Sequence, residues 1–192
     1  ICDTIPPDRK QRSHCAKTNR LGETSMRDKR VRQLCLSALM AALIYVFTAF
    51  LHVPSATGYT HVGDGFLYLA GCILPAPFAA AAGAIGAGLS DILSGYTAWA
   101  PWTIVIKALT GLCFSCKSDK IVSKRNLLAL IPALVLCAGG YYLCGAIMAG
   151  NFASPVAEIP GNLIQWAFSS VLYVLLGSIL DRMKFKQKMG VI

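Results

Sequence analysis

Three charged side chains, Asp64, Asp91 and Lys107, stand inside an otherwise apolar stretch that runs from Val62 to Cys116. Two carboxylates and one amine can bind a polar ligand, neutralise one another or take part in proton transfer. A charge at the centre of a bilayer costs about 2.5–3.5 kcal/mol on insertion scales, so such residues usually face a cavity, a partner or a substrate. They are therefore the first candidates for a binding site. Lys107 either contacts the ligand or only neutralises Asp64 or Asp91.

Other spacings that could support chemistry are incomplete. The run Gly111–Ser118 departs from a phosphate-binding loop because Cys116 stands where the second glycine is needed. Cys113 and Cys116 have the spacing of a metal or redox site, but no second Cys/His pair accompanies them. The run His61–Asp64 lacks the first glycine of the G-x-G-D motif of intramembrane aspartyl proteases. We expect no metal, no cofactor and no catalytic residues.

The composition indicates a membrane protein. Hydrophobic residues make up 55% of the chain and charged residues only 14%, and the mean hydropathy is +0.56. The net charge of +9 does not predict nucleic-acid binding, because the basic residues cluster beside apolar runs instead of covering a folded surface. The lipid bilayer is the expected surrounding, and the fold class is an all-α bundle of transmembrane helices.

The distribution of Lys and Arg predicts the topology. Basic clusters lie at residues 1–32, 117–125 and 182–188, and nine of the eighteen Lys and Arg are in the first of them. No Lys or Arg occurs in residues 52–61, 94–98 or 150–160. The positive-inside rule then places both termini and the loop at 117–126 in the cytoplasm, so the number of crossings is even.

Six membrane helices satisfy this topology. Three apolar runs have the roughly 20 residues that a ~30 Å hydrocarbon core requires. The stretch 62–116 is far too long for one crossing, and it is broken at Pro75 and Pro77 and again at Ser94–Tyr96 with Pro101. The predicted helices cover residues 33–51, 62–74, 77–93, 98–116, 127–149 and 160–180. They form one domain at 26–188, between a basic, disordered extension at 1–25 and a tail at 189–192.

This topology places the charged residues in the outer half of the bundle. Asp64, Asp91, Lys107 and Glu158 share that depth with a set of aromatic, imidazole and amide side chains, namely Tyr59, His61, Tyr68, Tyr96, Trp99, Trp102, Asn162, Gln165 and Trp166. Carboxylates and amides can bond a small polar ligand while rings stack on it, which predicts a binding cavity. Two structural alternatives stay open: aromatic residues also gather at membrane interfaces, and Asp–Lys pairs can be structural.

Small residues predict a second surface. Ala38 and Ala42 lie four residues apart on one face of the first helix, a spacing that lets another helix approach closely.

Several runs together resemble the substrate-binding S components of energy-coupling-factor (ECF) transporters. The runs are His61–Leu69, Gly88–Tyr96 leading to Ala100-Pro101, Lys107 and Gly161–Gln165. The resemblance extends over about residues 26–188 and is closest to the riboflavin-transporter-like branch.

The resemblance implies a function. S components bind a vitamin or vitamin precursor near the outer face, cap it with the loop between the first two helices, here residues 52–61, and topple in the membrane to release it. They dock on a transmembrane coupling subunit that carries two ATPases and is either dedicated to one S component or shared among several. The docking face would include Ala38 and Ala42, and the setting would be a prokaryotic plasma membrane. The implied ligand contacts are Asp64, Asp91, Trp99, Lys107, Glu158 and Asn162.

Two other classes of function remain. A self-sufficient secondary transporter of a small polar heterocycle would usually show an internal repeat, which this chain lacks. An intramembrane enzyme would need a nucleophile or metal set, and only the incomplete patterns above are available. The residues leave the ligand open among heteroaromatic compounds such as pyridoxine, a pyrimidine precursor of thiamin or riboflavin.

Overall fold

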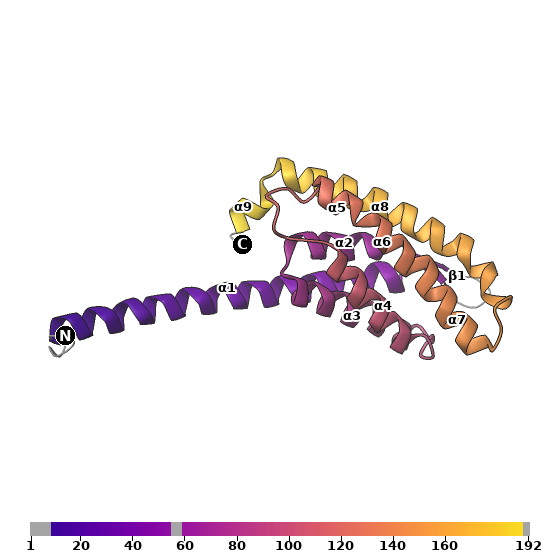
Figure 1. Cartoon of the computed structure of the whole chain (residues 1–192), viewed down its shortest axis with the longest axis horizontal. Coiled ribbons are helices and arrows are strands. Elements are labelled where there is room, and N and C mark those ends of the chain that lie inside the picture. The colour runs from indigo at the N-terminus through magenta and orange to yellow at the C-terminus, as the bar shows by residue number, and fades with distance from the viewer. Residues whose placement is uncertain (1–8, 55–58, 190–192) are drawn as a thin grey trace, which may run out of the picture.

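The structure, a computed structural model, describes residues 9–54 and 59–189. It is a bundle of helices with one small antiparallel hairpin at one end (Figure 1). The predicted helical class is therefore confirmed. The sequence did not predict the hairpin, which consists of β1 (His52–Pro54) paired with β2 (Tyr59–His61).

Helix α1 (Arg9–Ala49) is much longer than the predicted helix at 33–51 and projects from the bundle as a rod (Figure 1). The part from Arg9 to residue 25, predicted to be disordered, is helical here. That segment contains no proline and only one glycine, Gly22, so nothing in it interrupts the helix. Residues 1–8 and 190–192, the rest of the predicted extension and most of the predicted tail, lie outside the described residues.

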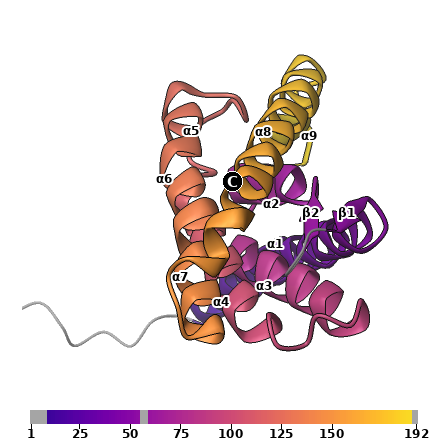
Figure 2. The same cartoon turned by 90° about the vertical axis from the view of Figure 1, so that its right-hand side faces the viewer.

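Helix α2 (Asp64–Ile73) is the centre of the bundle. All of its residues are buried, and it contacts α1, α3, α4 and α8. Figure 2, which looks along the bundle, shows α2 enclosed by these neighbours. A helix that is apolar on every side is expected in such a position. Its first residue, Asp64, is thereby brought into the protein interior.

Helices α3 (Ala76–Leu93) and α4 (Ala100–Cys113) pack against each other, and α3 also packs along α1. Both begin with a proline in the first turn, as predicted from Pro77 and Pro101. Gly86 allows the close approach of α3 to α1, because a Cβ there would lie 2.5 Å from the carbonyl oxygen of Ala41.

The second half of the chain forms two long helical stretches. The first consists of α5 (Lys124–Leu128), α6 (Leu130–Leu134), the π-helical turn η1 (Val135–Gly140) and α7 (Tyr141–Ala149), where the sequence predicted one helix at 127–149. The second consists of the 3₁₀ turn η2 (Ser154–Glu158) and α8 (Ile159–Arg182), followed by the short α9 (Phe185–Met189). A π-turn inside an α-helix is often found near a functional site.

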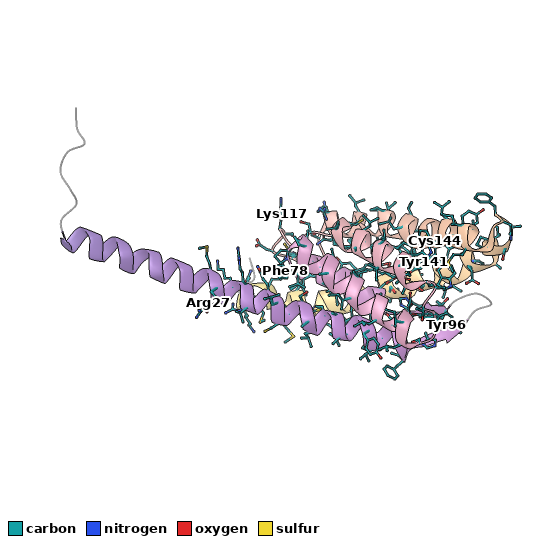
Figure 3. The ribbon with its side chains drawn as sticks, turned by 90° about the horizontal axis from the view of Figure 1, so that it is seen from below. Arg27, Phe78, Tyr96, Lys117, Tyr141 and Cys144 are labelled. Carbon is teal, nitrogen blue, oxygen red and sulfur yellow. The ribbon has the colours of Figure 1, made fainter. Side chains whose placement is uncertain are left out.

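Four helical stretches among the described residues are long and apolar enough to cross a bilayer, namely Met26–Ala49, Ala76–Leu93, Lys124–Ala149 and Ser154–Arg182. Helices α2 and α4 are apolar but shorter. Arg27 and Lys117 lie at one end of the bundle and Tyr96 lies at the other (Figure 3). The six crossings and the cytoplasmic side of the termini stay predictions.

Candidate functional site

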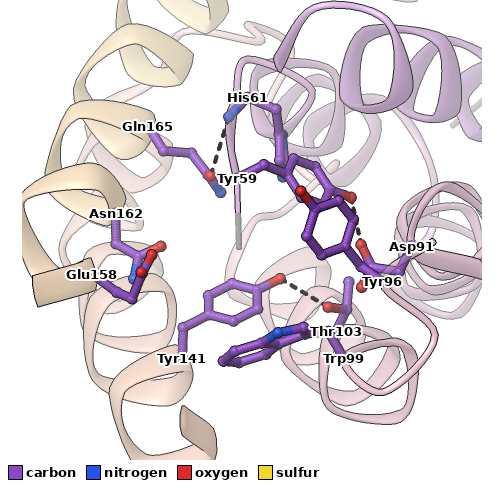
Figure 4. Close-up of a pocket in the computed structure, with 10 residues that line it drawn as sticks. All are labelled: Tyr59, His61, Asp91, Tyr96, Trp99, Thr103, Tyr141, Glu158, Asn162 and Gln165. Atoms are coloured by element: carbon purple, nitrogen blue, oxygen red, sulfur yellow. Dashed lines mark hydrogen bonds between the residues drawn. The ribbon is translucent and has the colours of Figure 1, made fainter. Parts of the chain in front are cut away.

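A pocket lies at the hairpin end of the bundle, and we call it the aromatic pocket. It encloses about 460 Å³ of empty space, part of which is open to the outside. The side chains that line it come from six elements and from the turn between α3 and α4 (Figure 4): Tyr59, His61, Asp91, Tyr96, Trp99, Thr103, Tyr141, Glu158, Asn162 and Gln165.

The turn between α3 and α4 sets one wall. Asp91 lies in the last turn of α3, and its carbonyl accepts a hydrogen bond from the backbone N–H of Tyr96 at 2.8 Å. Gly95 has a φ of +87°, a backbone conformation that is costly for residues with a side chain. Glycine therefore allows the chain to reverse direction here. The reversal brings Tyr96 and Trp99 to the pocket beside Asp91.

The hairpin lies over this wall. The Tyr59 hydroxyl donates a short hydrogen bond to Oδ1 of Asp91, and the Tyr59 ring packs on the Tyr96 ring with centroids 4.7 Å apart. The resemblance implied a capping role for residues 52–61. Both ends of that segment form the hairpin, whereas residues 55–58 lie outside the described residues.

The opposite wall combines rings with amide and carboxylate groups. Tyr141 directly follows the π-turn, donates a hydrogen bond to the Thr103 hydroxyl at 3.3 Å and lies 6.0 Å from Trp99 between ring centroids. Glu158 ends η2, and Asn162 lies in the first turns of α8, so both reach the pocket from the same side (Figure 4).

Asp64 and Lys107 do not line the pocket. They form an ion pair of 2.7 Å, and their side chains are only 2% and 1% exposed. Lys107 Nζ also lies 5.1 Å from the centroid of the Tyr141 ring. The lysine pairs with Asp64, and no hydrogen bond or ion pair joins it to Asp91 in the part of the chain that the structure describes.

Gln165 connects this pair to the pocket wall. Its Nε2 donates to Oδ2 of Asp64 at 2.9 Å, and its Oε1 accepts the backbone N–H of His61 at 3.3 Å. Both ends of the amide are therefore used, and its orientation is determined by the hydrogen bonds it makes. Loss of the Asp64–Lys107 ion pair would therefore alter the position of Gln165, which is itself part of the pocket wall.

The predicted site residues thus divide into two groups. Asp91, Trp99, Glu158 and Asn162 meet in the aromatic pocket, whereas Asp64 and Lys107 lie in the protein interior beneath it. Sequence reasoning placed Tyr59, His61, Tyr96 and Gln165 at the right depth without assigning them to the site.

Sequence reasoning missed Thr103 and Tyr141 altogether. Thr103 lies one helical turn before Lys107 on the same face of α4, a spacing that could have revealed it. Tyr141 carries no comparable signal. Three aromatic residues that the sequence grouped at this depth do not line the pocket, namely Tyr68, Trp102 and Trp166. Tyr68 packs on Phe114 in the core, and Trp166 Nε1 donates to the carbonyl of Leu130 at 2.8 Å.

His61 is neutral in the folded protein, because burial lowers its pKa to about 3. Its Nδ1 accepts the backbone N–H of Gly63 at 3.2 Å, which assigns the ring proton to Nε2. An unfolded histidine has a pKa of about 6.5 and takes up a proton more readily as the pH falls. We therefore expect the free energy of unfolding to decrease as the pH falls from about 6.5 toward 3.

Thermal unfolding of the purified protein at a series of pH values checks this expectation. In His61→Asn the stability should depend less on pH between about 6.5 and 3, since the variant lacks the titrating ring. Equal slopes in the variant and the original protein would contradict the expectation.

An apolar groove runs between α1 and α3, and we call it the alanine groove. Ala38 and Ala42 line this groove, and both are exposed. The remaining lining residues are also almost all apolar: Leu34, Ser37, Ala41, Tyr45, Pro77, Phe78, Ala81, Ala82, Ile85, Gly86 and Leu89.

Comparison with known proteins adds a family likeness. A family model described as "ECF-type riboflavin transporter, S component" matches residues 28–182. An "Uncharacterized protein in gap 3'region" of Pyrococcus woesei is 27% identical over 131 residues, which are 68% of this chain and 87% of that protein. A "UPF0397 protein" of Lactiplantibacillus plantarum is 24% identical over 163 residues, covering 78% of this chain and 86% of that protein. The matched range includes every residue of the aromatic pocket.

Proposed function

The chain belongs to the ECF-type riboflavin transporter S component family, and from that premise we propose that it binds a small heteroaromatic vitamin or vitamin precursor and carries it across the cell membrane. Members of this family are membrane-embedded, non-catalytic transporter subunits. The energy for transport would come from ATPases in partner subunits.

The aromatic pocket is the observation that carries this proposal. It combines four aromatic rings with carboxylate and amide groups at one end of an apolar bundle. Rings that stack on a planar ligand and polar groups that determine its orientation are what a binding site for a small heterocycle requires. The direct contacts would be Asp91, Trp99, Glu158 and Asn162, while Asp64 and Lys107 would position Gln165 and Tyr141.

The alanine groove is the proposed docking surface for the transmembrane coupling subunit. Its small residues would let a partner helix approach closely, and close packing is the main source of helix association in a bilayer. Ala38 and Ala42 are exposed, so a partner could contact them without unpacking α1 from α3.

We also propose that residues 26–188 form one domain with six crossings, that residues 1–25 are an extension of it, and that both termini lie in the cytoplasm. The basic clusters support this orientation. The pocket would then open on the outer side, where a transported nutrient arrives.

Uptake measurements test the proposal. The full chain is expressed in a vitamin-requiring bacterial host, either alone or together with a coupling subunit and two ATPases. Uptake of labelled riboflavin, thiamin and pyridoxine is then measured before and after ATP depletion. We expect ATP-dependent uptake of one of them only when the partners are present. Efficient uptake by the lone chain that survives ATP depletion would overturn the proposal and favour a secondary transporter.

A further inference from the structure

The end of the bundle opposite the aromatic pocket carries many exposed cations. Arg27 and Lys117 lie at this end, whereas Tyr96 of the pocket lies at the other (Figure 3). We call it the basic end. Its exposed cations are Arg27, Lys29, Arg30, Arg32, Lys117, Lys120, Lys124, Arg125, Arg182, Lys184 and Lys188.

Contacts between distant segments gather these cations at one place. The Asp181 carboxylate, near the end of α8, accepts the backbone N–H groups of Ile121 and Val122 at 2.7 and 2.9 Å. The loop before α5 is thereby held against α8. The Arg32 side chain of α1 donates to the carbonyl of Met189, the last residue of α9. The basic end is therefore a surface formed jointly by α1, the loop before α5, α5, α8 and α9.

Acidic side chains do not balance the charge of the basic end. In residues 26–32, 117–125 and 181–189 the acids are Asp28, Asp119 and Asp181. Asp181 uses both carboxylate oxygens to accept backbone N–H groups. Within the part of the chain that the structure describes, no ion pair joins an acid to an exposed cation of the basic end. The surface therefore has a positive potential that attracts anions.

Exposed apolar side chains lie beside these cations, on the side toward the middle of the bundle. Leu128 follows Lys124 by four residues, and Ile179 precedes Arg182 by three, so each apolar residue lies on the same helix face as its cation. Leu128 is 65% exposed and Ile179 is 54% exposed, and neither lines the alanine groove. A molecule that satisfies both features has an anionic group joined to hydrocarbon.

We propose that the basic end binds the phosphate groups of anionic phospholipids, whose acyl chains lie on the exposed apolar side chains beside the cations. The family is membrane-embedded, so lipid is the surrounding that these side chains meet. Anionic lipids attract clusters of Lys and Arg next to membrane helices. The proposal goes beyond the binding of a vitamin, because the aromatic pocket shares no lining residue with the basic end.

A comparison of two lipids on the full chain tests the proposal. The purified protein is incubated in neutral detergent with equal amounts of dioleoylphosphatidylglycerol and dioleoylphosphatidylcholine, which have the same acyl chains and a phosphate each but differ in net charge. Free lipid is removed, and bound lipid is quantified by mass spectrometry. We expect at least about threefold more bound phosphatidylglycerol. Equal binding of the two lipids would overturn the proposal and favour an acidic protein as the partner of the basic end.

Salt provides a second measurement on the same preparation. Because salt screens exposed charges, we expect about 0.5 M NaCl to remove most of the preference for phosphatidylglycerol. A preference that is unchanged at this concentration would contradict binding through the exposed cations.

Thermal unfolding in detergent distinguishes a lipid from free phosphate. We expect phosphatidylglycerol to raise the melting temperature more than phosphatidylcholine does, since a ligand that binds the folded state stabilises it. Sodium phosphate should raise it no more than sodium chloride of equal ionic strength. A rise with sodium phosphate as large as that with phosphatidylglycerol would show a site for phosphate alone and overturn the role of the lipid.

Lys117→Gln/Lys124→Gln/Arg182→Gln removes three cations of the basic end. We expect this variant to lose most of the preference for phosphatidylglycerol. It should unfold like the original protein when no lipid is added, because all three side chains are exposed. A folded variant that keeps the full preference would overturn the proposal. The comparison of the two lipids on the original protein decides the question even where the variant does not fold.

Arg9→Gln/Lys10→Gln/Arg12→Gln is the matched control. It makes the same change in net charge on the part of α1 that projects from the bundle (Figure 1). Arg12 precedes Met26, where the apolar part of α1 begins, by fourteen residues, or about 21 Å of helix. That distance exceeds the Debye length of about 8 Å at physiological salt, so the lipid preference should stay unchanged. An equal loss of preference in the control would show that the basic end is not the site.

Discussion

Lys107→Met is expected to destabilise the protein by about 3–5 kcal/mol, the usual effect of removing one partner from a buried ion pair. The substitution keeps an unbranched side chain of similar length but removes the charge that balances Asp64. That carboxylate is 2% exposed and lies inside the bundle, so water cannot replace the lost ammonium group. Among the described residues, Gln165 Nε2 is the one donor that would remain to this carboxylate.

The double variant Asp64→Asn/Lys107→Met provides the decisive comparison. Both charges are then absent, and the asparagine oxygen can still accept the hydrogen bond from Gln165. We expect this variant to recover most of the stability that Lys107→Met loses, because no uncompensated charge remains in the interior. Lys120→Met, at an exposed position of the loop before α5, is the control and should unfold like the original protein.

Unfolding by heat and by denaturant in detergent measures all four proteins. A single variant as stable as the original, or a double variant less stable than the single one, would contradict the expectation. Ligand affinity of the folded double variant adds a second readout. We expect it to lose less affinity than Asp91→Asn, since Asp64 and Lys107 act on the pocket through Gln165 and Tyr141 and do not line it.

The sequence predicted those features of the fold that depend on residue types along one segment. Apolar run length and proline positions predicted helices close to the observed α2, α3, α4 and α8. Depth along each helix followed from the same runs, which is why Asp91, Trp99, Glu158 and Asn162 were grouped correctly before the structure was known. Depth does not give the rotation of a helix about its axis.

The sequence could not predict the features that depend on the rotation of a helix about its axis or on packing between segments far apart in the chain. Whether Lys107 pairs with Asp64 or with Asp91 depends on the side of α4 that faces α2, and those helices meet across 43 residues of sequence. The strands of the hairpin have three residues each, too few to produce a recognisable pattern of residue types, and they lie between α1 and α2, which pack against each other. The π-turn before Tyr141 ends at Gly140, where an added Cβ would lie 3.2 Å from the Ile106 side chain of α4, and this proximity of two distant segments cannot be predicted from either one alone.

Ala38→Leu and Ala42→Leu are expected to abolish assembly with the coupling subunit and to leave ligand binding unchanged. The added isobutyl group would fill the alanine groove where a partner helix needs to approach closely. Both positions are exposed in the isolated chain, so the larger side chain has room and the packing of α1 on α3 should survive. Transport should fall to the level of the chain without partners.

Co-purification with the coupling subunit and the ATPases measures assembly, and calorimetry on the same preparation measures ligand binding. Ala167→Leu is the matched control, because it adds the same group to an exposed alanine of α8 outside the groove. Assembly of the groove variants at the original level would show that the partner docks elsewhere. Loss of ligand binding together with assembly would show that the groove residues support the fold, since the aromatic pocket shares no lining residue with the groove.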